Sequence, residues 1–456
     1  MVGGSPTNSQ QTAPFPMQLK PVLGPVHLVF YSVGVIVGAG VYSVIGKAAA
    51  LAEGSLWWSF AGGALVALLT GLSYAEMTTS FPNAGAEYVY TRRALPRADW
   101  MAFGVAIVIL VGGAAASTTI ALAFGGYLQE FVDVPPVVSA LLLLLFCTAF
   151  NAWGLSEASW VNILFTSLEV AGLIVVVAAG LTREDFAAPL MRPPQAGVLE
   201  AAAILFFVYL GFEEVANLSE ETRDAPRSLP RAIFLSLAIT TTLYVLVALA
   251  VTALATPAEL GASAAPLALA VHKAWPGAAI VLSAIALFAT ANTVLISLIA
   301  AARLAFAMAR DGDLPSVFTA LSASRRSPWA AALLVFALSI AFLPIGDLKV
   351  LAEMSSFAAL VAFLVVNLTL IILRYREPEH LRPFRVPIAI GRLPLLPLLA
   401  IGGIGLLLMH FERAIYLAGA VALVLTALAY VVRRHWGGAR GRLARTLRSD
   451  ISGAPR

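Results

Sequence analysis

This chain of 456 residues has few charged side chains, one cysteine and five histidines. Charged residues make up 12% of the sequence, against about a quarter in soluble domains. The single cysteine, Cys147, excludes an internal disulfide and lies in an apolar run, where a buried thiol is expected. The histidines are too scattered to give metal-ligand spacing. These shortages exclude a soluble or disulfide-built domain, and we expect no metal site.

Long apolar runs take the place of the missing charge. Apolar residues form 60% of the chain. Most fall in segments of about 18 residues or more, the length that crosses about 30 Å of hydrocarbon. We therefore expect an all-α polytopic membrane protein with twelve transmembrane helices, at about 25–52, 55–80, 100–127, 136–153, 158–181, 199–222, 229–255, 277–308, 328–344, 348–374, 393–410 and 413–433.

The basic residues predict the orientation of these helices. Residues 1–20 are polar and lack the early basic region of a cleaved signal peptide, so we place them in the cytoplasm. Most of the 29 lysines and arginines then fall on the cytoplasmic side, including the basic tail 434–456. This asymmetry predicts a cell-membrane protein with both termini cytoplasmic. For the tail it favours contact with anionic lipids over nucleic-acid binding. The outer side receives Lys47, Arg183, Arg192, Lys273, Lys349 and Arg413.

Two of the predicted helices contain residues that are costly at bilayer depth. The first carries glycines within Gly34–Tyr42, and the sixth, over Phe206–Glu214, sets a glycine beside two carboxylates. Such residues are tolerated where they line a cavity. A matched pair of interrupted segments, one in each half of a chain, indicates the binding site of a secondary transporter.

Depth along the helices brings three features together. At a rise of about 1.5 Å per residue, Gly38 lies roughly 18 Å into the first helix. By the same count Gly211 and Glu169 each lie roughly 16 Å along the sixth and fifth helices. The first and sixth helices also run in opposite senses, as an inverted repeat requires. We therefore expect Gly38, Gly211 and Glu169 to meet near the midplane.

The glycines of the first helix have two interpretations. Gly34 and Gly38 form a G-x-x-x-G pattern that is typical of tight helix packing. Packing does not explain Gly40 or the break in the sixth helix, so we favour an unwound segment. Its amides would suit a carboxylate and its carbonyls an ammonium, which fits an amino acid or related amine. The small-residue stretches 112–117 and 289–293 either allow close helix contact or leave room for a ligand.

The buried acids also have two interpretations each. Glu213 and Glu214 lie side by side, so desolvation and repulsion favour a proton on one of them. Either can be a proton carrier, a contact for a substrate ammonium or a structural acid. Glu169 is a coupling or gating residue, or else a structural hydrogen-bond partner of the first break. Phe207 is a core aromatic residue or a lid over the substrate.

Further charged residues fall near the cytoplasmic helix ends. They either form an ion-pair network that closes the inner side or lie at a solvated interface: Glu76, Glu220, Glu221, Arg303 and Arg310. The stretch from Gly40 to Lys47 fails as a phosphate-binding loop because its spacing is wrong and Ala48 follows the lysine. No nucleophile–base pair or metal cluster is evident in the sequence. We expect a protein that is not an enzyme and has no cofactor.

Several of these segments resemble the amino acid–polyamine–organocation (APC) superfamily of permeases, in particular bacterial homologues of cationic amino acid transporters. The resemblance covers roughly residues 22 to 433 with order and spacing kept. It is carried by four motifs together, each of which is weak alone: Gly38–Tyr42, Phe81–Tyr90, Tyr209–Ile233 and Met308–Pro315.

The resemblance implies the leucine-transporter fold and alternating access. Helices 1–5 (residues 21–181) and 6–10 (182–376) would form inverted repeats, with helices 11–12 (377–433) appended. Phe207 would be the aromatic gate, and Glu213 matches a position where cationic amino acid transporters often carry an acid. The candidate substrate-binding residues are Ile36, Gly38, Ala39, Gly40, Phe207, Gly211 and Glu213.

The chain departs from the family pattern at Glu169. Several proton-coupled relatives have a lysine at the matching position in helix 5. An acid there leaves proton and sodium coupling open, and the proton-coupling candidates are Glu169, Glu213 and Glu214. We expect a secondary active transporter of amino acids or related amines, coupled to H⁺. The alternatives are a polyamine or organic-cation exchanger and a nutrient sensor that does not transport. The particular substrate and the oligomeric state stay open.

Overall fold

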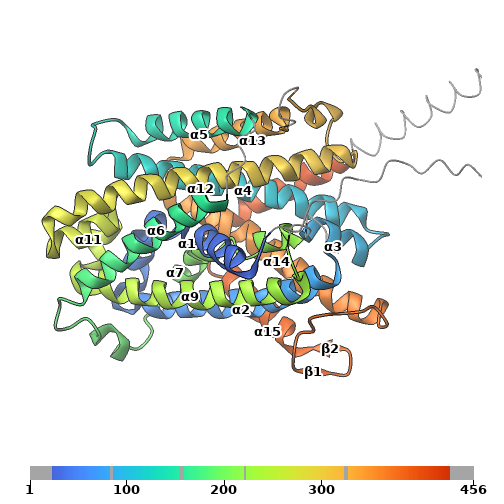
Figure 1. Cartoon of the computed structure of the whole chain (residues 1–456), viewed down its shortest axis with the longest axis horizontal. Coiled ribbons are helices and arrows are strands. Elements are labelled where there is room, and N and C mark those ends of the chain that lie inside the picture. The colour runs from blue at the N-terminus through green and yellow to red at the C-terminus, as the bar shows by residue number, and fades with distance from the viewer. Residues whose placement is uncertain (1–22, 83–85, 154–158, 220–221, 323–326, 432–456) are drawn as a thin grey trace, which may run out of the picture.

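The computed structural model describes residues 23–82, 86–153, 159–219, 222–322 and 327–431. Both predicted tails, 1–20 and 434–456, lie outside these ranges. The described chain folds almost entirely into helices (Figure 1). Their bounds are α1 Pro25–Ala52, α2 Leu56–Ser80, α3 Ala86–Ala94, α4 Asp99–Leu128, α5 Pro136–Trp153, α6 Ser159–Gly180, α7 Val198–Leu205, α8 Glu214–Asn217, α9 Ala225–Leu254, α10 Pro257–Ala262, α11 Pro266–Ala274, α12 Pro276–Arg310, α13 Trp329–Phe342, α14 Leu348–Arg376 and α15 Leu395–Leu408.

A last helix covers Arg413–Val431. Short 3-10 helices add η1 (Glu53–Ser55), η2 (Ala188–Met191), η3 (Phe206–Tyr209), η5 (Ser316–Thr319) and η6 (Leu343–Ile345). The two-residue strands β1 (Ala389–Ile390) and β2 (Leu393–Pro394) pair antiparallel. The expectation of an α-helical membrane protein is confirmed. Neither the hairpin nor the short helices α3, α10 and α11 were predicted from the sequence.

Eight helical stretches of the described chain are long and apolar enough to cross a membrane. The first of them, Pro25–Ser80, contains both α1 and α2, and two shorter apolar helices are Trp329–Ile345 and Leu395–Leu408. The predicted helix 199–222 is divided into α7, η3 and α8. The number of twelve spans therefore stays a prediction.

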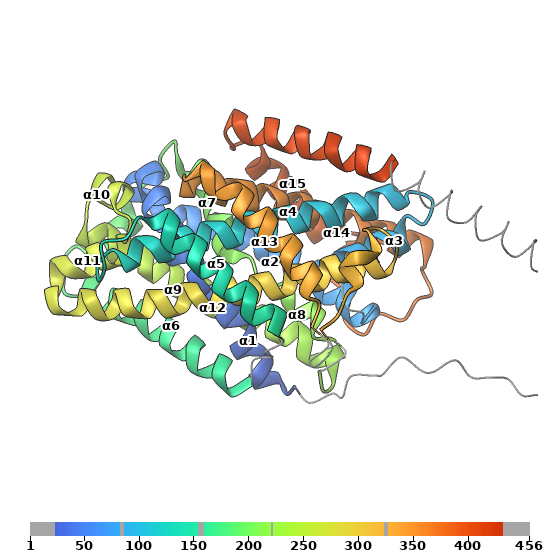
Figure 2. The ribbon, with the colours of Figure 1, turned by 90° about the horizontal axis from the view of Figure 1, so that it is seen from above.

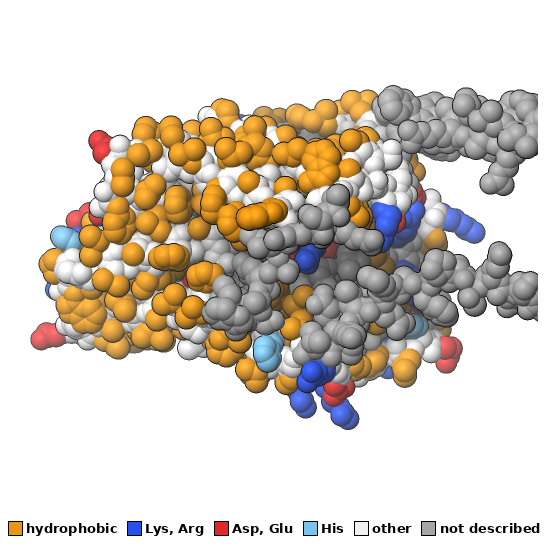
Figure 3. All heavy atoms as spheres, turned by 45° about the horizontal axis from the view of Figure 1, so that its top comes forward, with side chains coloured by type: hydrophobic (Ala, Val, Ile, Leu, Met, Phe, Trp, Pro, Cys, Tyr) orange, Lys and Arg blue, Asp and Glu red, His pale blue; other side chains and the backbone are white. Residues whose placement is uncertain are grey.

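The first helix, α1, lies at the centre of the bundle and is mostly buried. It packs against α6, α7, α9 and α12 (Figure 1). The last helix instead lies along the outside of the bundle, and only 11% of its most apolar stretch is buried (Figure 2). Apolar side chains outnumber charged ones on the face shown in Figure 3, as is expected of a lipid-facing surface.

Loops gather at two opposite ends of the bundle. At one end, which we call the basic end, Arg93 pairs with Glu377 and Arg376 donates to the Ala94 carbonyl. In Figure 3, Lys and Arg side chains concentrate at one end of the visible face. At the opposite end, the Lys47 ammonium donates to the Gly261 carbonyl. This separation keeps charged groups away from the apolar middle of the helices.

Candidate functional site

The first helix is interrupted at Gly38. Its backbone angles, φ −14° and ψ −147°, are not helical and divide α1 into two segments. A Cβ atom at this position would lie 2.5 Å from the Thr293 Oγ1 on α12. The helix is therefore interrupted at a single residue of the segment where the sequence predicted unwinding, and α12 packs directly against this residue.

The predicted helix 199–222 is interrupted at Leu210 and Gly211, the two residues that follow η3. Leu210 is extended, with φ −63° and ψ 140°, and Gly211 has φ +120°, a conformation that L side chains rarely adopt. The Gly211 amide donates to Oε2 of Glu213 over 2.8 Å. Glu213 thus satisfies a backbone group that the interruption frees, and α8 begins at the next residue.

The two interrupted helices touch through their backbones. A Cβ atom on Gly211 would lie 3.2 Å from the Ile36 amide nitrogen. One on Gly40 would lie 3.1 Å from the Cα of Val208. A side chain at either position would press against the other helix, and Gly211 also has a φ that L side chains rarely adopt, which is consistent with glycine in both segments. We call this contact of α1 with η3 and Gly211 the helix crossing.

Two side chains from other helices hold the crossing. The Tyr244 hydroxyl on α9 lies 2.6 Å from the Ile36 carbonyl oxygen and 3.1 Å from that of Val208. The Ala39 amide donates to Thr293 Oγ1 over 3.0 Å. Thr293 lies in the small-residue stretch singled out in the sequence, but Tyr244 was missed. A search for polar side chains in the middle of each apolar run would have found it.

Glu169 lies beside the crossing, as its depth along α6 predicted. The residue is 1% exposed, and its backbone carbonyl accepts a hydrogen bond of 3.0 Å from the Tyr42 hydroxyl. Its side chain also interacts electrostatically with Tyr42 and Tyr244. These contacts connect α6 both to the segment of α1 that follows Gly38 and to the tyrosine that holds the crossing.

The remaining candidate site residues lie in η3 and at the start of α8. Phe207 is 4% exposed in η3, just ahead of the break. Glu213 and Glu214 are half-buried and interact electrostatically with each other and with Glu87 of α3. Tyr74 of α2 donates to Glu87 Oε1 over 2.6 Å. The acids therefore form a group at the start of α8, on the side of the crossing that leads to the basic end.

One small-residue stretch serves helix packing. A Cβ on Gly112 of α4 would lie 2.6 Å from the Ala358 Cβ on α14, so these two helices are in close contact there. Of the two interpretations that the sequence left open for this stretch, Gly112 fits close contact. The other stretch contacts the crossing through Thr293.

The sequence left two interpretations for the charged residues near the predicted cytoplasmic helix ends, an ion-pair network or a solvated interface, and the described members differ from one another. Glu76 is buried, and its carboxylate accepts hydrogen bonds from Arg374 and pairs with Arg382 at 3.1 Å. Arg303 and Arg310 are exposed on α12. Glu220 and Glu221 lie outside the described residues. The tertiary contact between α2 and α14 decides this pairing, and residue depth alone could not predict it.

A second charged cluster lies at the opposite end of the bundle. Lys349 Nζ lies 3.1 Å from Glu200 Oε1, 2.6 Å from Glu412 Oε1 and 3.7 Å from Glu353 Oε1. Carboxylate oxygens of the three acids lie within 4.8 Å of one another, a spacing that could hold a metal ion. The Lys349 ammonium supplies the counter-charge in this structure. The cluster links α7, α14 and the segment before the last helix.

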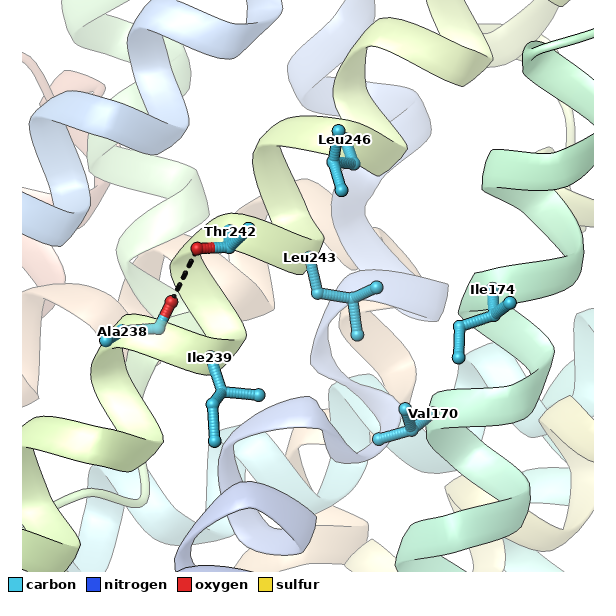
Figure 4. Close-up of a pocket in the computed structure, with 7 residues that line it drawn as sticks. All are labelled: Val170, Ile174, Ala238, Ile239, Thr242, Leu243 and Leu246. Carbon is cyan, nitrogen blue, oxygen red and sulfur yellow. Dashed lines mark hydrogen bonds between the residues drawn. The ribbon is translucent and has the colours of Figure 1, made fainter.

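A shallow groove of about 440 Å³ lies between α6 and α9 (Figure 4). Its walls are almost wholly apolar, and its one hydroxyl, Thr242 Oγ1, donates to the Ala238 carbonyl of its own helix. It offers no group that recognises an amino acid. The groove fits a lipid-facing surface and is separate from the helix crossing.

Comparison with known proteins identifies related permeases and transporters. A family model described as amino acid permease matches residues 23–430. An uncharacterized transporter of Mycobacterium tuberculosis is 32% identical over 92% of both chains. A branched-chain amino acid permease of Bacillus subtilis is 28% identical over 84% of this chain and 86% of its own length. The vacuolar cationic amino acid transporter 4 of Arabidopsis thaliana is 30% identical over 80% of this chain and 65% of its own.

The matched residues span the helix crossing, Glu169 and nearly all of the described chain. The family and the long apolar helices indicate a multi-pass membrane protein, and the family and the names of the relatives support amino acid transport. The chain belongs to the amino acid permease family of the APC superfamily.

Proposed function

We propose that this protein is a secondary active transporter that carries amino acids or related amines across the cytoplasmic membrane by alternating access. The observation that carries the proposal is the helix crossing, where Gly38 and Gly211 interrupt two membrane helices in backbone contact. Interrupted helices expose backbone donors and acceptors inside a membrane, where polar groups are otherwise absent.

The crossing offers recognition for both ends of an amino acid. Amides at the start of the outer segment of α1, after Gly38, face a carboxylate favourably because they form a helix N-terminus. Carbonyl groups around Ile36 and Leu210 suit an ammonium. We assign substrate contact to Ile36, Gly38, Ala39, Gly40, Phe207, Gly211 and Glu213. Phe207 acts as the lid because it precedes the break and is buried against it.

Coupling to protons is the second part of the proposal. Glu169 is buried beside the crossing, and Glu213 and Glu214 lie on the route toward the basic end. A buried carboxyl group binds a proton readily, since burial disfavours its charged form. Protonation and substrate binding then both act on the two interrupted helices, and either event changes the free energy of the other.

The proposal includes the leucine-transporter architecture with twelve spans. Residues 21–181 and 182–376 would be the inverted repeats, each beginning with an interrupted helix, and residues 377–433 would supply the appended helices. The peripheral position of the last helix supports this division. The basic end is cytoplasmic by the positive-inside rule, which puts both termini in the cytoplasm.

Relatives differ in what their names say they carry. They include a branched-chain amino acid permease, cationic amino acid transporters and a methylthioribose transporter of Bacillus subtilis. Exchange of polyamines or other organic cations is the second candidate, because adjacent Glu213 and Glu214 could neutralise a second positive charge. The nearby Tyr209 hydroxyl donates to the Phe60 carbonyl, so this hydroxyl is already used within the protein.

Uptake into proteoliposomes tests the proposal. We expect a radiolabelled neutral or cationic amino acid to accumulate when the lumen is alkaline, and not when a protonophore removes the gradient. Competition by putrescine without competition by amino acids would favour the exchanger. High-affinity binding with no flux under any gradient would contradict transport and favour a sensor.

A further inference from the structure

The segment between α14 and α15 forms a polar cavity at the basic end. Its volume is about 350 Å³, and its lining includes Arg374, Arg382, Arg385 and Arg392. The family comparison and the proposed transport do not account for these four guanidinium groups. Their arrangement is therefore a separate feature of the molecule.

A buried carboxylate holds the cavity wall in place. Glu76 of α2 accepts hydrogen bonds from Arg374 Nε and from the Val386 amide, at 2.9 Å and 2.7 Å. Arg382 pairs with the same carboxylate and donates to the Leu373 and Glu377 carbonyls. The loop is thus fixed to the ends of α2 and α14, so the cavity is a built site.

The hairpin of β1 and β2 supplies the fourth arginine. Ile390 pairs with Leu393, which leaves Gly391 and Arg392 as the two turn residues. Gly391 has φ +62°, which such two-residue turns require. The turn chemistry therefore fixes Arg392 at the tip of the hairpin, where it lines the cavity.

The side chains that line the cavity carry more positive than negative charge. Four guanidinium groups line it against one carboxylate, Glu379. Glu76 behind the wall is shared by Arg374 and Arg382. Burial lowers the pKa of Arg382; the charge of Glu76 opposes this, and the neighbouring charges of Arg374 and Arg385 lower the pKa further. A bound anion would relieve this repulsion.

Arg374 also has a hydrogen-bond donor that no described residue accepts. It is 2% exposed, and its Nη1 has no hydrogen-bond partner among the described residues, while Nε and Nη2 are engaged by Glu76. A buried charged donor without a partner is costly. The guanidinium fork pairs with two oxygens of one anion, as in a carboxylate or a phosphate, and several guanidinium groups together suit the larger charge of a phosphate.

We propose that this cavity binds a phosphate group, carried either by an anionic phospholipid or by a soluble phosphate. Arg374 and Arg382 form its base, and Arg385 and Arg392 close over the anion. The exposed apolar side chains nearby favour the lipid source: Leu381 is 80% exposed and Ile390 70%. Such side chains are stabilised when they enter the membrane interface.

The test uses the full-length protein with two arginines changed. Arg374→Gln would break the pair with Glu76 and endanger folding, so the variant is Arg385→Gln/Arg392→Gln. Both of these residues are exposed and outside the helices. The matched control is Arg97→Gln/Arg310→Gln, which removes the same charge from exposed positions that do not line the cavity.

Binding is measured by thermal unfolding and native mass spectrometry, with phosphatidylglycerol, phosphatidylcholine and inorganic phosphate as probes. We expect phosphatidylglycerol to bind the wild type and the control equally, and the cavity variant about tenfold more weakly or worse. Stabilisation by inorganic phosphate at fixed ionic strength, lost in the same variant, would assign a soluble phosphate. Equal binding by the cavity variant and the control, or no preference for either phosphate probe, would overturn the proposal. Amino acid uptake by both variants separates this result from the transport proposal.

Discussion

The hydroxyl group of Tyr244 lies 2.6 Å from the carbonyl oxygen of Ile36. In an uninterrupted helix this carbonyl would accept from the amide four residues later. Gly38, whose backbone is not helical, lies between the two residues that such a bond would join, and a side chain from α9 hydrogen-bonds to this carbonyl. The same hydroxyl lies 3.1 Å from the Val208 carbonyl, so α9 holds both interrupted helices at one point.

Removing this hydroxyl should impair transport more than folding. Tyr244→Phe leaves the Ile36 and Val208 carbonyls without this donor, and inside a membrane such a hydrogen bond contributes about 1 kcal/mol. We expect a small fall in melting temperature and a large fall in uptake by proteoliposomes. Tyr416→Phe is the control, because that hydroxyl donates to the Leu408 carbonyl, away from the helix crossing. Equal uptake by both variants would contradict the role of Tyr244.

Substitutions at Gly38 and Thr293 should have non-additive effects on ligand-induced thermal stabilisation. A Cβ on residue 38 would lie 2.5 Å from Thr293 Oγ1 and 3.2 Å from its Cγ2, so Gly38→Ala should abolish ligand-induced thermal stabilisation. Thr293→Ala removes both atoms, and the double variant should therefore be no worse than Thr293→Ala alone. Gly402→Ala, with open space around its Cβ, should behave as the wild type. Additive losses in the double variant would mean that the clash is not the cause.

Glu169 should determine the pH dependence of transport. Glu169→Gln keeps the size of the buried side chain but cannot release a proton, so we expect uptake that is lost or insensitive to pH. Melting temperature and detergent elution profile should stay close to those of the wild type. A mutant that follows the wild-type pH profile of uptake would make Glu169 a structural acid.

The Glu76 pairing should be a major contribution to stability. Glu76→Gln leaves Arg374 buried without its carboxylate and should lower the free energy of unfolding by about 3–5 kcal/mol. Arg93→Gln breaks the exposed pair with Glu377 and should change it by less than about 1 kcal/mol. Thermal or denaturant unfolding in detergent measures both. Similar changes in the two variants would show that burial does not strengthen the Glu76 contact.

Lys349 should stabilise its three acids in a pH-dependent way. In Lys349→Met, Glu200, Glu353 and Glu412 repel one another, and we expect a loss on the order of 1–3 kcal/mol near pH 7. The loss should shrink as pH falls, because protonation of the carboxyl groups removes the repulsion. Melting curves of both proteins between pH 5 and pH 8 provide the measurement. A difference that is constant with pH, or that grows at low pH, would contradict this account.

Much of the candidate site followed from the sequence. Gly38 and Gly211 were recognised because glycine inside an apolar segment is costly unless the backbone needs it. Residue depth placed Glu169 beside them, since helix rise is constant. The partners of Glu76, Arg374 and Arg382, were not predicted: depth gives a level in the bilayer, but not the face of a helix or the neighbour across it.

The sequence by itself determined that the chain is helical and embedded in a membrane, because apolar runs without charge leave the backbone no other partners. It also determined where two of the helices are interrupted. Only the tertiary structure decided which groups satisfy the freed backbone: Tyr244, Thr293 and Glu213 come from different elements. It likewise decided the phosphate cavity, whose arginines converge through the Glu76 pairing and the β1–β2 turn. Such contacts depend on how distant segments pack, and no local pattern encodes them.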